Sequence, residues 1–257
     1  MKKALYVKDL CKTYIVNKRQ NNVLRNVNFS IPEGELTAIM GPSGSGKSTL
    51  LYAVSGMDQP TAGIVDFFGE EVASYSAARM SQVRLAEMGF IFQQMYFLKN
   101  LTIFDNIILP AYQLPQNKGA QKRKEVNERA RKLMHKLGIN QIAQNDIREV
   151  SGGELQRACI CRSLINHPKM LFADEPTGAL NQQNSKEVME ELSRINQEGT
   201  TIMLVTHDMK VAAKSDRILY IEDGTIKGEF ALGKREAEHS DKEREAKVTM
   251  WLAQMGW

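Results

Sequence analysis

Short runs of hydrophobic residues recur along the chain, bounded by glycine or by polar and charged residues. Three of them, 36–40, 170–173 and 201–205, hold four or five residues that are almost all apolar. An unbroken apolar run of this length is typical of a strand covered on both faces, as the inner strands of a parallel sheet are. The sequence therefore predicts a buried parallel sheet. Residues 49–54, which follow the first run closely, are predicted to form a helix.

The pattern changes between residues 93 and about 166, where apolar positions recur at helical spacing. The residues that share one helical face are Val126, Ala130, Leu133, Met134 and Leu137. Such a stripe is typical of an amphipathic helix whose opposite face meets solvent. That opposite face is rich in Lys and Arg, which we assign to solvent and not to nucleic acid. The sequence thus predicts a helical subdomain over residues 93–166.

The C-terminal part combines a charged run, residues 234–247, with a second apolar stripe. The stripe consists of Val248, Trp251, Leu252 and Met255, at positions i, i+3, i+4 and i+7. We expect a charged linker and a short helix over residues 231–257. Packing of the stripe on its own domain is the favoured interpretation, and a contact with another subunit is the alternative.

Composition describes an ordinary globular chain. Its 257 residues are 42% hydrophobic and carry a net charge of +4, which by itself does not indicate a nucleic-acid-binding protein. No apolar run approaches the ~20 residues that span a bilayer, and the charged start is unlike a signal peptide. The odd number of cysteines, Cys11, Cys159 and Cys161, lacks metal-ligand spacing and predicts reduced thiols. We therefore expect a cytoplasmic protein.

A glycine-rich loop, residues 41–49, lies between the first predicted strand and its helix. Its residues are Gly41, Pro42, Ser43, Gly44, Ser45, Gly46, Lys47, Ser48 and Thr49, which match G-x-x-x-x-G-K-[ST]. In this context the backbone N–H groups and the helix N-terminus surround phosphate oxygens. Lys47 supplies a positive charge, and the Ser48 hydroxyl is suited to bind Mg²⁺. This phosphate loop predicts binding of ATP with Mg²⁺.

Two carboxylates, Asp174 and Glu175, follow the apolar run 170–173. An inner parallel strand delivers such residues at its C-terminal end, where ligands bind. Asp174 is predicted to hold Mg²⁺, partly through water. Glu175 is predicted to be the general base that polarises the attacking water.

A second glycine motif precedes a predicted helix over residues 154–164. It consists of Ser151, Gly152, Gly153 and Glu154, here called the signature loop. A helix N-terminus of this kind is a second anion site on the same chain. Because an ATP molecule has only one terminal phosphate, the two sites most simply belong to two copies of the chain. The sequence thus predicts a two-fold dimer with two ATP molecules between the subunits.

The phosphate loop, the signature loop and the acidic strand end, in this order, resemble the ATP-binding cassette (ABC) ATPases over roughly residues 1–230. The resemblance implies an α/β fold with a P-loop NTPase (RecA-like) core, an N-terminal antiparallel β part and an inserted α-helical subdomain. The expected single domain takes its core from residues 1–92 and 167–230. The helical subdomain over 93–166 carries the signature loop.

Further residues match the family by position. Tyr14 resembles the aromatic residue that stacks on adenine. Gln93 resembles the Q-loop glutamine, which is implied to contact Mg²⁺ or the attacking water. His207, after the run 201–205, resembles the switch histidine near the terminal phosphate. All three are expected to serve ATP binding or hydrolysis.

The chain departs from the family pattern at a few positions. Asn181 stands where the loop that crosses the dimer usually ends in aspartate, so the strength of communication between subunits is in question. Glu154 replaces the more common glutamine, and Val150 replaces leucine.

Family membership implies a separate membrane permease as partner and a peripheral location at the cytoplasmic face of the membrane. Four features resemble a group that includes lipoprotein-release, macrolide-export and antimicrobial-peptide (bacitracin-type) resistance systems: the insert between Tyr14 and Val23-Leu24, the Arg84-to-Gln93 segment ending GFIFQ, the run FADEPTGAL and the ending TMWLAQMGW. Peptide resistance is the favoured hypothesis within this group. A soluble, non-transport ABC ATPase and a non-hydrolysing regulatory module are the alternatives.

An apolar and aromatic cluster follows Gln93. It comprises Met95, Tyr96, Phe97, Leu98, Leu101, Ile103 and Phe104. Since these residues cannot all face inward on one element, the exposed remainder predicts an interface. The resemblance implies a groove here that accepts a short helix of the permease.

Overall fold

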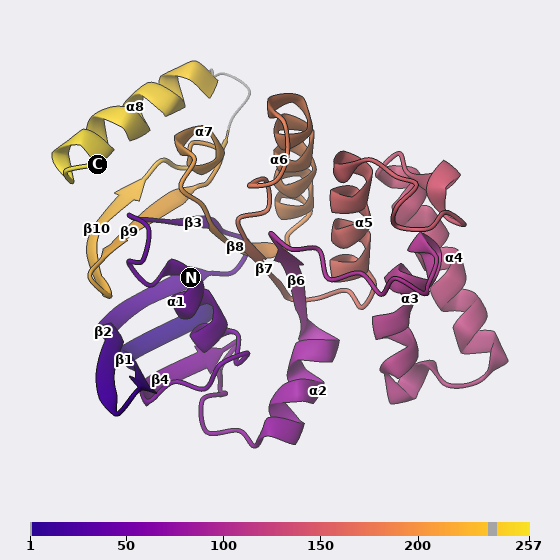
Figure 1. Ribbon diagram of the computed structural model, residues 1–257, viewed down its shortest axis with the longest axis horizontal. Coiled ribbons are helices and arrows are strands. Elements are labelled where there is room, and N and C mark those ends of the chain that lie inside the picture. The colour runs from indigo at the N-terminus through magenta and orange to yellow at the C-terminus, as the bar shows by residue number, and fades with distance from the viewer. Residues whose placement is uncertain (1, 236–240) are drawn as a thin grey trace.

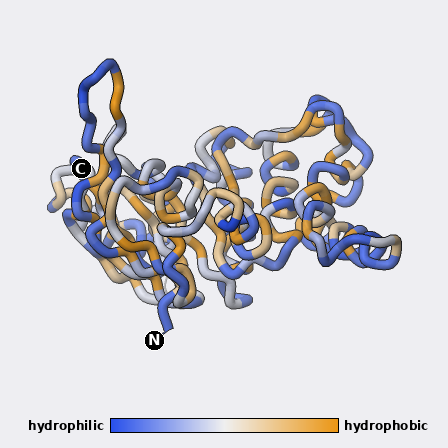
Figure 2. The backbone as a smooth tube through the Cα atoms, turned by 90° about the horizontal axis from the view of Figure 1, so that it is seen from below, coloured by the Kyte–Doolittle hydropathy of each residue, from blue (hydrophilic) through white to orange (hydrophobic). Residues whose placement is uncertain are grey.

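The computed structural model describes residues 2–235 and 241–257. Two sheets and a group of helices make up the molecule (Figure 1). Hydrophobic residues follow the inner strands, and hydrophilic residues gather in the outer loops (Figure 2). The expected α/β fold is confirmed.

The larger sheet has six strands in the order β10-β9-β3-β8-β7-β6. Its strands are β3 (Leu36–Met40), β6 (Met88–Phe92), β7 (Met170–Asp174), β8 (Thr201–Val205), β9 (Arg217–Glu222) and β10 (Thr225–Ala231). All neighbours pair in parallel except β10, which is antiparallel to β9. Every residue of β3, β7 and β8 is buried, as their apolar runs predicted.

The smaller sheet is antiparallel, with the order β2-β1-β4-β5. Its strands are β1 (Lys3–Val16), β2 (Arg19–Pro32), β4 (Ala62–Phe67) and β5 (Glu70–Glu71). Asn17 and Lys18 join β1 to β2 with positive φ angles of 50° and 62°, which suit a tight hairpin turn. A hydrophobic cluster that includes Leu50 and Leu51 fills the space between the two sheets.

Eight α-helices complete the described part of the chain. They are α1 (Lys47–Val54), α2 (Ala77–Glu87), α3 (Ile103–Gln113), α4 (Ala120–Lys136), α5 (Gly152–Leu164), α6 (Gln182–Gln197), α7 (Met209–Ala212) and α8 (Asp241–Gln254). Two 3-10 turns, Pro115–Asn117 and Asn140–Ile142, lie between α3 and α5. None of the described helices is both long enough and apolar enough to cross a membrane.

Helices α3, α4 and α5 lie together on one side of the large sheet, away from the antiparallel sheet (Figure 1). Val126, Ala130 and Met134 of α4 are buried against this group, as the stripe predicted. Helix α2 was not predicted. It has a weakly patterned sequence in which only Met80 is buried, and Ser76 caps its N-terminus. The sequence of α2 therefore has no hydrophobic stripe that would predict the helix.

The C-terminal stripe packs on its own domain, as the favoured interpretation stated. Val248 and Leu252 are fully buried, and the Trp251 ring stacks on Phe230 with centroids 5.2 Å apart. The charged segment is not a linker over its whole length, because α8 begins within it. Arg244 of α8 is buried and donates hydrogen bonds to four backbone carbonyls, which fixes the helix. The expectation for residues 236–240 lies outside the described residues.

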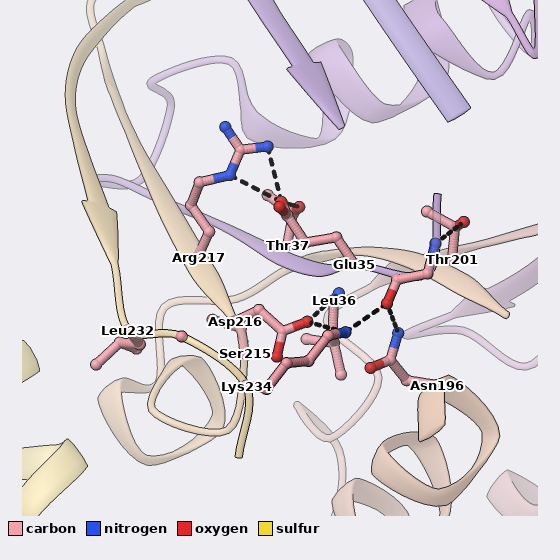
Figure 3. Close-up of polar contacts among 12 residues, drawn as sticks. Glu35, Leu36, Thr37, Asn196, Thr201, Ser215, Asp216, Arg217, Leu232 and Lys234 are labelled. Carbon is pink, nitrogen blue, oxygen red and sulfur yellow. Dashed lines mark hydrogen bonds and ion pairs between the residues drawn. The ribbon is translucent and has the colours of Figure 1, made fainter. Parts of the chain in front are cut away.

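A polar network fixes the start of β3 (Figure 3). Asp216 accepts hydrogen bonds from the Leu36 backbone N–H, at 2.9 Å, and from the Lys234 ammonium, at 2.7 Å. Beside it, Arg217 pairs with Glu35. This network ties β3 to β9 at one end, so that the opposite end of β3 presents its loop at a defined place.

Candidate active site

Three neighbouring parallel strands end at the same edge of the large sheet. The strand order places β8 between β3 and β7. The phosphate loop follows β3, Asp174 and Glu175 stand at the end of β7, and His207 follows β8. Topology therefore gathers three motifs that are far apart in the sequence.

The phosphate loop needs glycine at two positions for physical reasons. A Cβ atom on Gly41 would lie 1.9 Å from the Ile221 carbonyl oxygen. Gly46, with a φ of 102°, caps α1 in a left-handed conformation. Lys47, the residue after Gly46, turns back and donates hydrogen bonds of 2.8 Å to the carbonyl oxygens of Gly41 and Pro42.

The loop has the features of a phosphate cradle. No side chain caps α1, and no acidic residue lies in its first turn. The Ser45 hydroxyl is buried and has no hydrogen-bond partner among the described residues. Burial lowers the pKa of Lys47, although Glu175 and Asp174 favour its charged form. The uncapped N–H groups at the start of α1, the positive end of its helix dipole and the Lys47 ammonium together fit a polyphosphate ligand.

Asp174 lies between two hydroxyl groups of α1. The Ser48 hydroxyl donates to Asp174 Oδ1 at 2.8 Å, and the Tyr52 hydroxyl donates to Oδ2 at 2.6 Å. The described residues contain no group of three or more His, Cys, Asp or Glu side chains that would hold a metal by themselves. Ser48 and Asp174 oxygens nevertheless fit Mg²⁺, which keeps several waters and takes phosphate oxygens as ligands.

Tyr52 was missed by the sequence analysis. Its only signal is its position four residues after Ser48 in α1, which places both side chains on one helical face.

Glu175 and His207 meet directly. His207 Nδ1 lies 2.8 Å from Glu175 Oε1, and the Glu175 backbone N–H donates to the Val205 carbonyl at 3.0 Å. Glu175 has a φ of 47°, a left-handed conformation that turns its side chain away from the strand direction. The His207 side chain is 66% exposed and that of Glu175 only 15%, so the histidine covers the carboxylate from the solvent side.

Gln93 also reaches this edge of the sheet. It follows β6, the neighbour of β7. A Cβ atom built on Gly178 would lie 3.1 Å from Gln93 Nε2. The Gln93 amide thus lies against the turn that runs from Glu175 to Gly178, where the Gly178 N–H donates to the Glu175 carbonyl.

Tyr14 lies beside the start of α1. Its hydroxyl donates to Asp58 Oδ2 at 2.5 Å, and Lys12 binds the other oxygen of the same carboxylate. Burial raises the pKa of Tyr14, with Asp58 adding to the effect, and Thr49 is a further hydrogen-bond partner. The ring is therefore held in place next to the phosphate loop.

The signature loop forms a complete capping box on α5. The Ser151 hydroxyl donates to Glu154 Oε2 at 2.7 Å, the Ser151 N–H donates to the same oxygen at 2.9 Å, and Ser151 Oγ accepts from the Glu154 N–H. These bonds, the backbone one first, lower the pKa of Glu154. The start of α5 is thus stabilised without any ligand.

Asn181 lies close to the signature loop. Its side chain caps α6 by accepting from the Asn184 N–H at 2.9 Å. A Cβ atom on Gly153 would come within 2.8 Å of the Asn184 side chain, so α5 approaches α6 closely there. Helix α1 packs in the hydrophobic cluster on one face of the large sheet and α5 in the cluster on the other face, so the sheet lies between them. The structure therefore groups Asn181 with the signature loop and the remaining predicted residues with the phosphate loop.

Comparisons with known proteins identify the family of this chain. A family model described as "ABC transporter" matches residues 24–178. The dimeric structure of MJ0796, described as a bacterial ABC transporter cassette, is 35% identical and has a TM-score of 0.82, covering 90% of this chain and all of that one. A structure of MJ0796 with bound ADP and Pi, described as a post-hydrolysis state, is 33% identical with a TM-score of 0.80, again covering 90% of this chain and all of that one.

A third similar structure is CbiO1 from Clostridium perfringens, part of the ABC transporter complex cbiONQ. It is 25% identical with a TM-score of 0.79, covering 100% of this chain and 98% of that one. The chain belongs to the ATP-binding cassette family of ABC transporters, and it is an ABC-type ATPase.

Proposed function

We propose that two copies of this chain hydrolyse ATP between them and drive a separate membrane permease. The observation that carries the proposal is the meeting of the phosphate loop, Asp174, Glu175, His207 and Gln93 at one edge of the sheet. The signature loop, which lies elsewhere in the same chain, is then available to the ATP of a second copy. Similarity to a dimeric relative supports this arrangement.

Within one subunit, the residues of the phosphate loop hold the phosphates and Tyr14 stacks on adenine. Ser48, Asp174 and Gln93 are the residues that would hold Mg²⁺. When bound, the ion would draw electron density from the phosphate oxygens and favour attack on the terminal phosphorus.

Glu175 is proposed to accept the proton of the attacking water. Its contact with His207 at 2.8 Å orients the carboxylate and leaves its other oxygen for the water. His207 in turn is placed to meet the terminal phosphate, because its side chain is mostly exposed at this edge. Loss of the carboxylate would remove the base and leave the phosphate cradle intact.

Across the dimer, Ser151, Gly152, Gly153 and Glu154 are proposed to meet the terminal phosphate held by the partner copy. Their position at the N-terminus of α5 supplies N–H groups and a positive dipole end. Asn181 belongs to the same surface through its contact with Asn184, and is proposed to carry the signal between subunits.

The permease is proposed to dock in a groove of about 380 Å³ beside Gln93. Its walls come from α2, β6, α3 and α5, with Met57 and Tyr96 at the rim, and the side chains that define it are Arg84, Phe90, Phe92, Tyr96 and Arg162. Tyr96 is 65% exposed, whereas Ile103 and Phe104 are buried and Phe97 packs on the helical core. The lining holds no Asp or Glu, so the groove suits a short segment with apolar and acidic side chains.

The finer assignment follows from the resemblance. Peripheral attachment at the cytoplasmic face of the membrane is proposed from membership of the family. A role in export of or resistance to antimicrobial peptides is proposed from the resemblance of the insert after Tyr14 and of the C-terminal ending. Release of lipoproteins or export of macrolides remains the second candidate, because it shares these features.

The decisive test replaces Glu175 by Gln in the purified chain. We expect ATP binding to stay within about twofold, turnover to fall at least about 100-fold, and ATP with Mg²⁺ to hold two subunits together in sizing chromatography. Glu71→Gln, in the exposed strand β5, is the matched control and should behave as the wild type. A Glu175→Gln chain that binds ATP but stays monomeric at high concentration would contradict the dimer.

The permease assignment is tested by Tyr96→Ala in cells that produce this chain together with a membrane protein chosen as the candidate permease. We expect normal ATPase activity of the isolated subunit, weaker co-purification with that membrane protein, and lost transport. Met250→Ala, an equally exposed apolar residue on α8, is the control. Equal co-purification of both variants would move the docking surface elsewhere.

A further inference from the structure

The Asp174 carboxylate accepts two hydrogen bonds, and both donors belong to α1. Ser48 bonds to Oδ1 and Tyr52 bonds to Oδ2, at 2.8 and 2.6 Å. Asp174 is only 8% exposed. Each carboxylate oxygen of Asp174 therefore accepts a hydrogen bond from a different hydroxyl group, and rotation of the carboxylate would break both bonds.

Tyr52 is well suited to hold this contact. It lies one helical turn after Ser48, so both side chains project from the same face of α1 toward β7. Its backbone is anchored as well, because the Tyr52 carbonyl accepts from the N–H groups of Met57 and Asp58.

We propose that Tyr52 is a positioning residue for ATP hydrolysis: its hydroxyl holds one oxygen of Asp174 and thereby directs the other oxygen, together with Ser48, toward Mg²⁺. The inference rests on the proposed function, in which Ser48 and Asp174 hold the ion. In this proposal Tyr52 acts through the Asp174 carboxylate and is not itself a ligand of the ion.

The size of the effect follows from the behaviour of outer-shell partners of metal ligands. Loss of such a partner typically reduces metal affinity or activity about 10–100-fold. Without the Tyr52 hydroxyl, Asp174 Oδ2 loses its donor and the carboxylate is free to turn. Nucleotide held by the phosphate loop alone should not sense this change.

The experiment compares Tyr52→Phe with Tyr75→Phe in the purified chain. Tyr75 also donates a 2.5 Å hydrogen bond to a carboxylate, Glu70, but on an exposed surface outside the site. Affinity for a fluorescent ATP analogue is measured in EDTA and across a Mg²⁺ titration, and ATPase rates are measured over the same titration.

For Tyr52→Phe we expect analogue affinity in EDTA within about twofold of the wild type, and half-saturating Mg²⁺ raised about tenfold. The ATPase rate at saturating Mg²⁺ should recover to within about twofold, because the ion, once bound, restores the carboxylate orientation. Tyr75→Phe should change none of these values. The inference is overturned if the Mg²⁺ titration of Tyr52→Phe is unaltered. It is also overturned if this variant loses as much affinity for the ATP analogue in EDTA as in Mg²⁺.

Asp174→Asn separates this inference from the proposed function on which it rests. If Asp174→Asn alone leaves the Mg²⁺ dependence unchanged, the metal-binding role of Asp174 fails. If Asp174→Asn shifts the dependence and Tyr52→Phe does not, only the role of Tyr52 fails. In the double variant, Tyr52→Phe should add no further shift in Mg²⁺ dependence, because it acts through the carboxylate.

Discussion

The N-termini of α1 and α5, at the phosphate loop and the signature loop, are capped in opposite ways. Helix α1 has Gly46 as its cap, no side-chain hydrogen bond and no acidic residue in its first turn. Helix α5 has a full capping box between Ser151 and Glu154, and Glu154 places a carboxylate in its first turn. The N-terminus of α1 thus has no side-chain cap and lies beside a cation, Lys47, whereas at the N-terminus of α5 the capping box engages the Ser151 and Glu154 N–H groups.

This difference suits two different tasks. A loop that binds ATP in each separate subunit benefits from a helix N-terminus whose N–H groups no side chain caps. A loop that meets the ATP of a partner copy is exposed to water between encounters, and a capping box keeps its helix formed. We infer that the phosphate loop governs ATP affinity and that the signature loop governs dimerisation.

The largest effect is expected at the phosphate loop, before α1. Lys47→Ala removes the charge at the phosphates, and we expect ATP affinity of the isolated subunit to fall by tenfold or more, because a charge-assisted hydrogen bond contributes about 1.5–3 kcal/mol. Fluorescence titration with an ATP analogue measures this. Lys186→Ala, on the exposed face of α6, serves as the control. Unchanged affinity in the Lys47 variant would remove the phosphate loop from ATP binding.

Ser151→Ala removes the side-chain cap at the N-terminus of α5. Loss of an N-cap costs about 1 kcal/mol, so thermal unfolding should occur a few degrees lower. ATP affinity of the isolated subunit should not change, whereas ATP-driven dimerisation in the Glu175→Gln background should weaken about fivefold or more. If ATP affinity of the monomer falls as well, the two loops act on the same ATP within one chain.

Glu154→Gln tests the role of charge at the signature loop, because it keeps the shape of the capping box and removes its negative charge. A single charge at a helix N-terminus contributes about 0.3–1 kcal/mol, so ATP-driven dimerisation should strengthen about two- to fivefold once the carboxylate no longer repels phosphate. Analytical ultracentrifugation against ATP concentration measures the change. Weaker dimerisation would mean that the carboxylate contributes a favourable contact.

The same substitution has a pH signature. The pKa of Glu154 is lowered in the folded chain, so its stabilising contribution is present above the unfolded pKa of about 4.3 and is lost as pH falls through the folded value. The difference in melting temperature between wild type and Glu154→Gln should therefore be constant at neutral pH and disappear in acid. A difference that grows as pH falls would contradict the capping box.

The smallest effect is expected at Asn181. Its side chain caps α6, and aspartate caps a helix equally well. Asn181→Asp should leave thermal stability within about 0.5 kcal/mol and ATPase rate within about twofold. Asn181→Ala, which removes the cap, is the contrasting variant and should lower stability by about 1 kcal/mol. Complete loss of activity in Asn181→Asp would show that the charge at this position, and not the cap, decides communication between subunits.

Local sequence determined several elements because their signals are short-range. The apolar runs gave β3, β7 and β8 to within one residue of their bounds, and the glycines and Lys47 gave the phosphate loop. The stripes of α4 and α8 predicted which faces are buried. Helix α2 had no such signal. Helix α8 begins inside the charged run 234–247, whose composition predicted a linker.

Tertiary structure decided which of these elements meet. The sequence places Ser48 and Asp174 far apart and gives no reason to include Tyr52, whereas the parallel pairing of β7 and β8 beside β3 brings the Asp174 carboxylate between two side chains of α1. The bond between Glu175 and His207 depends on the same pairing. Residue type and spacing set the chemistry that each motif offers, but only the strand order, fixed by burial of both sheet faces, decides which motifs act on one ATP.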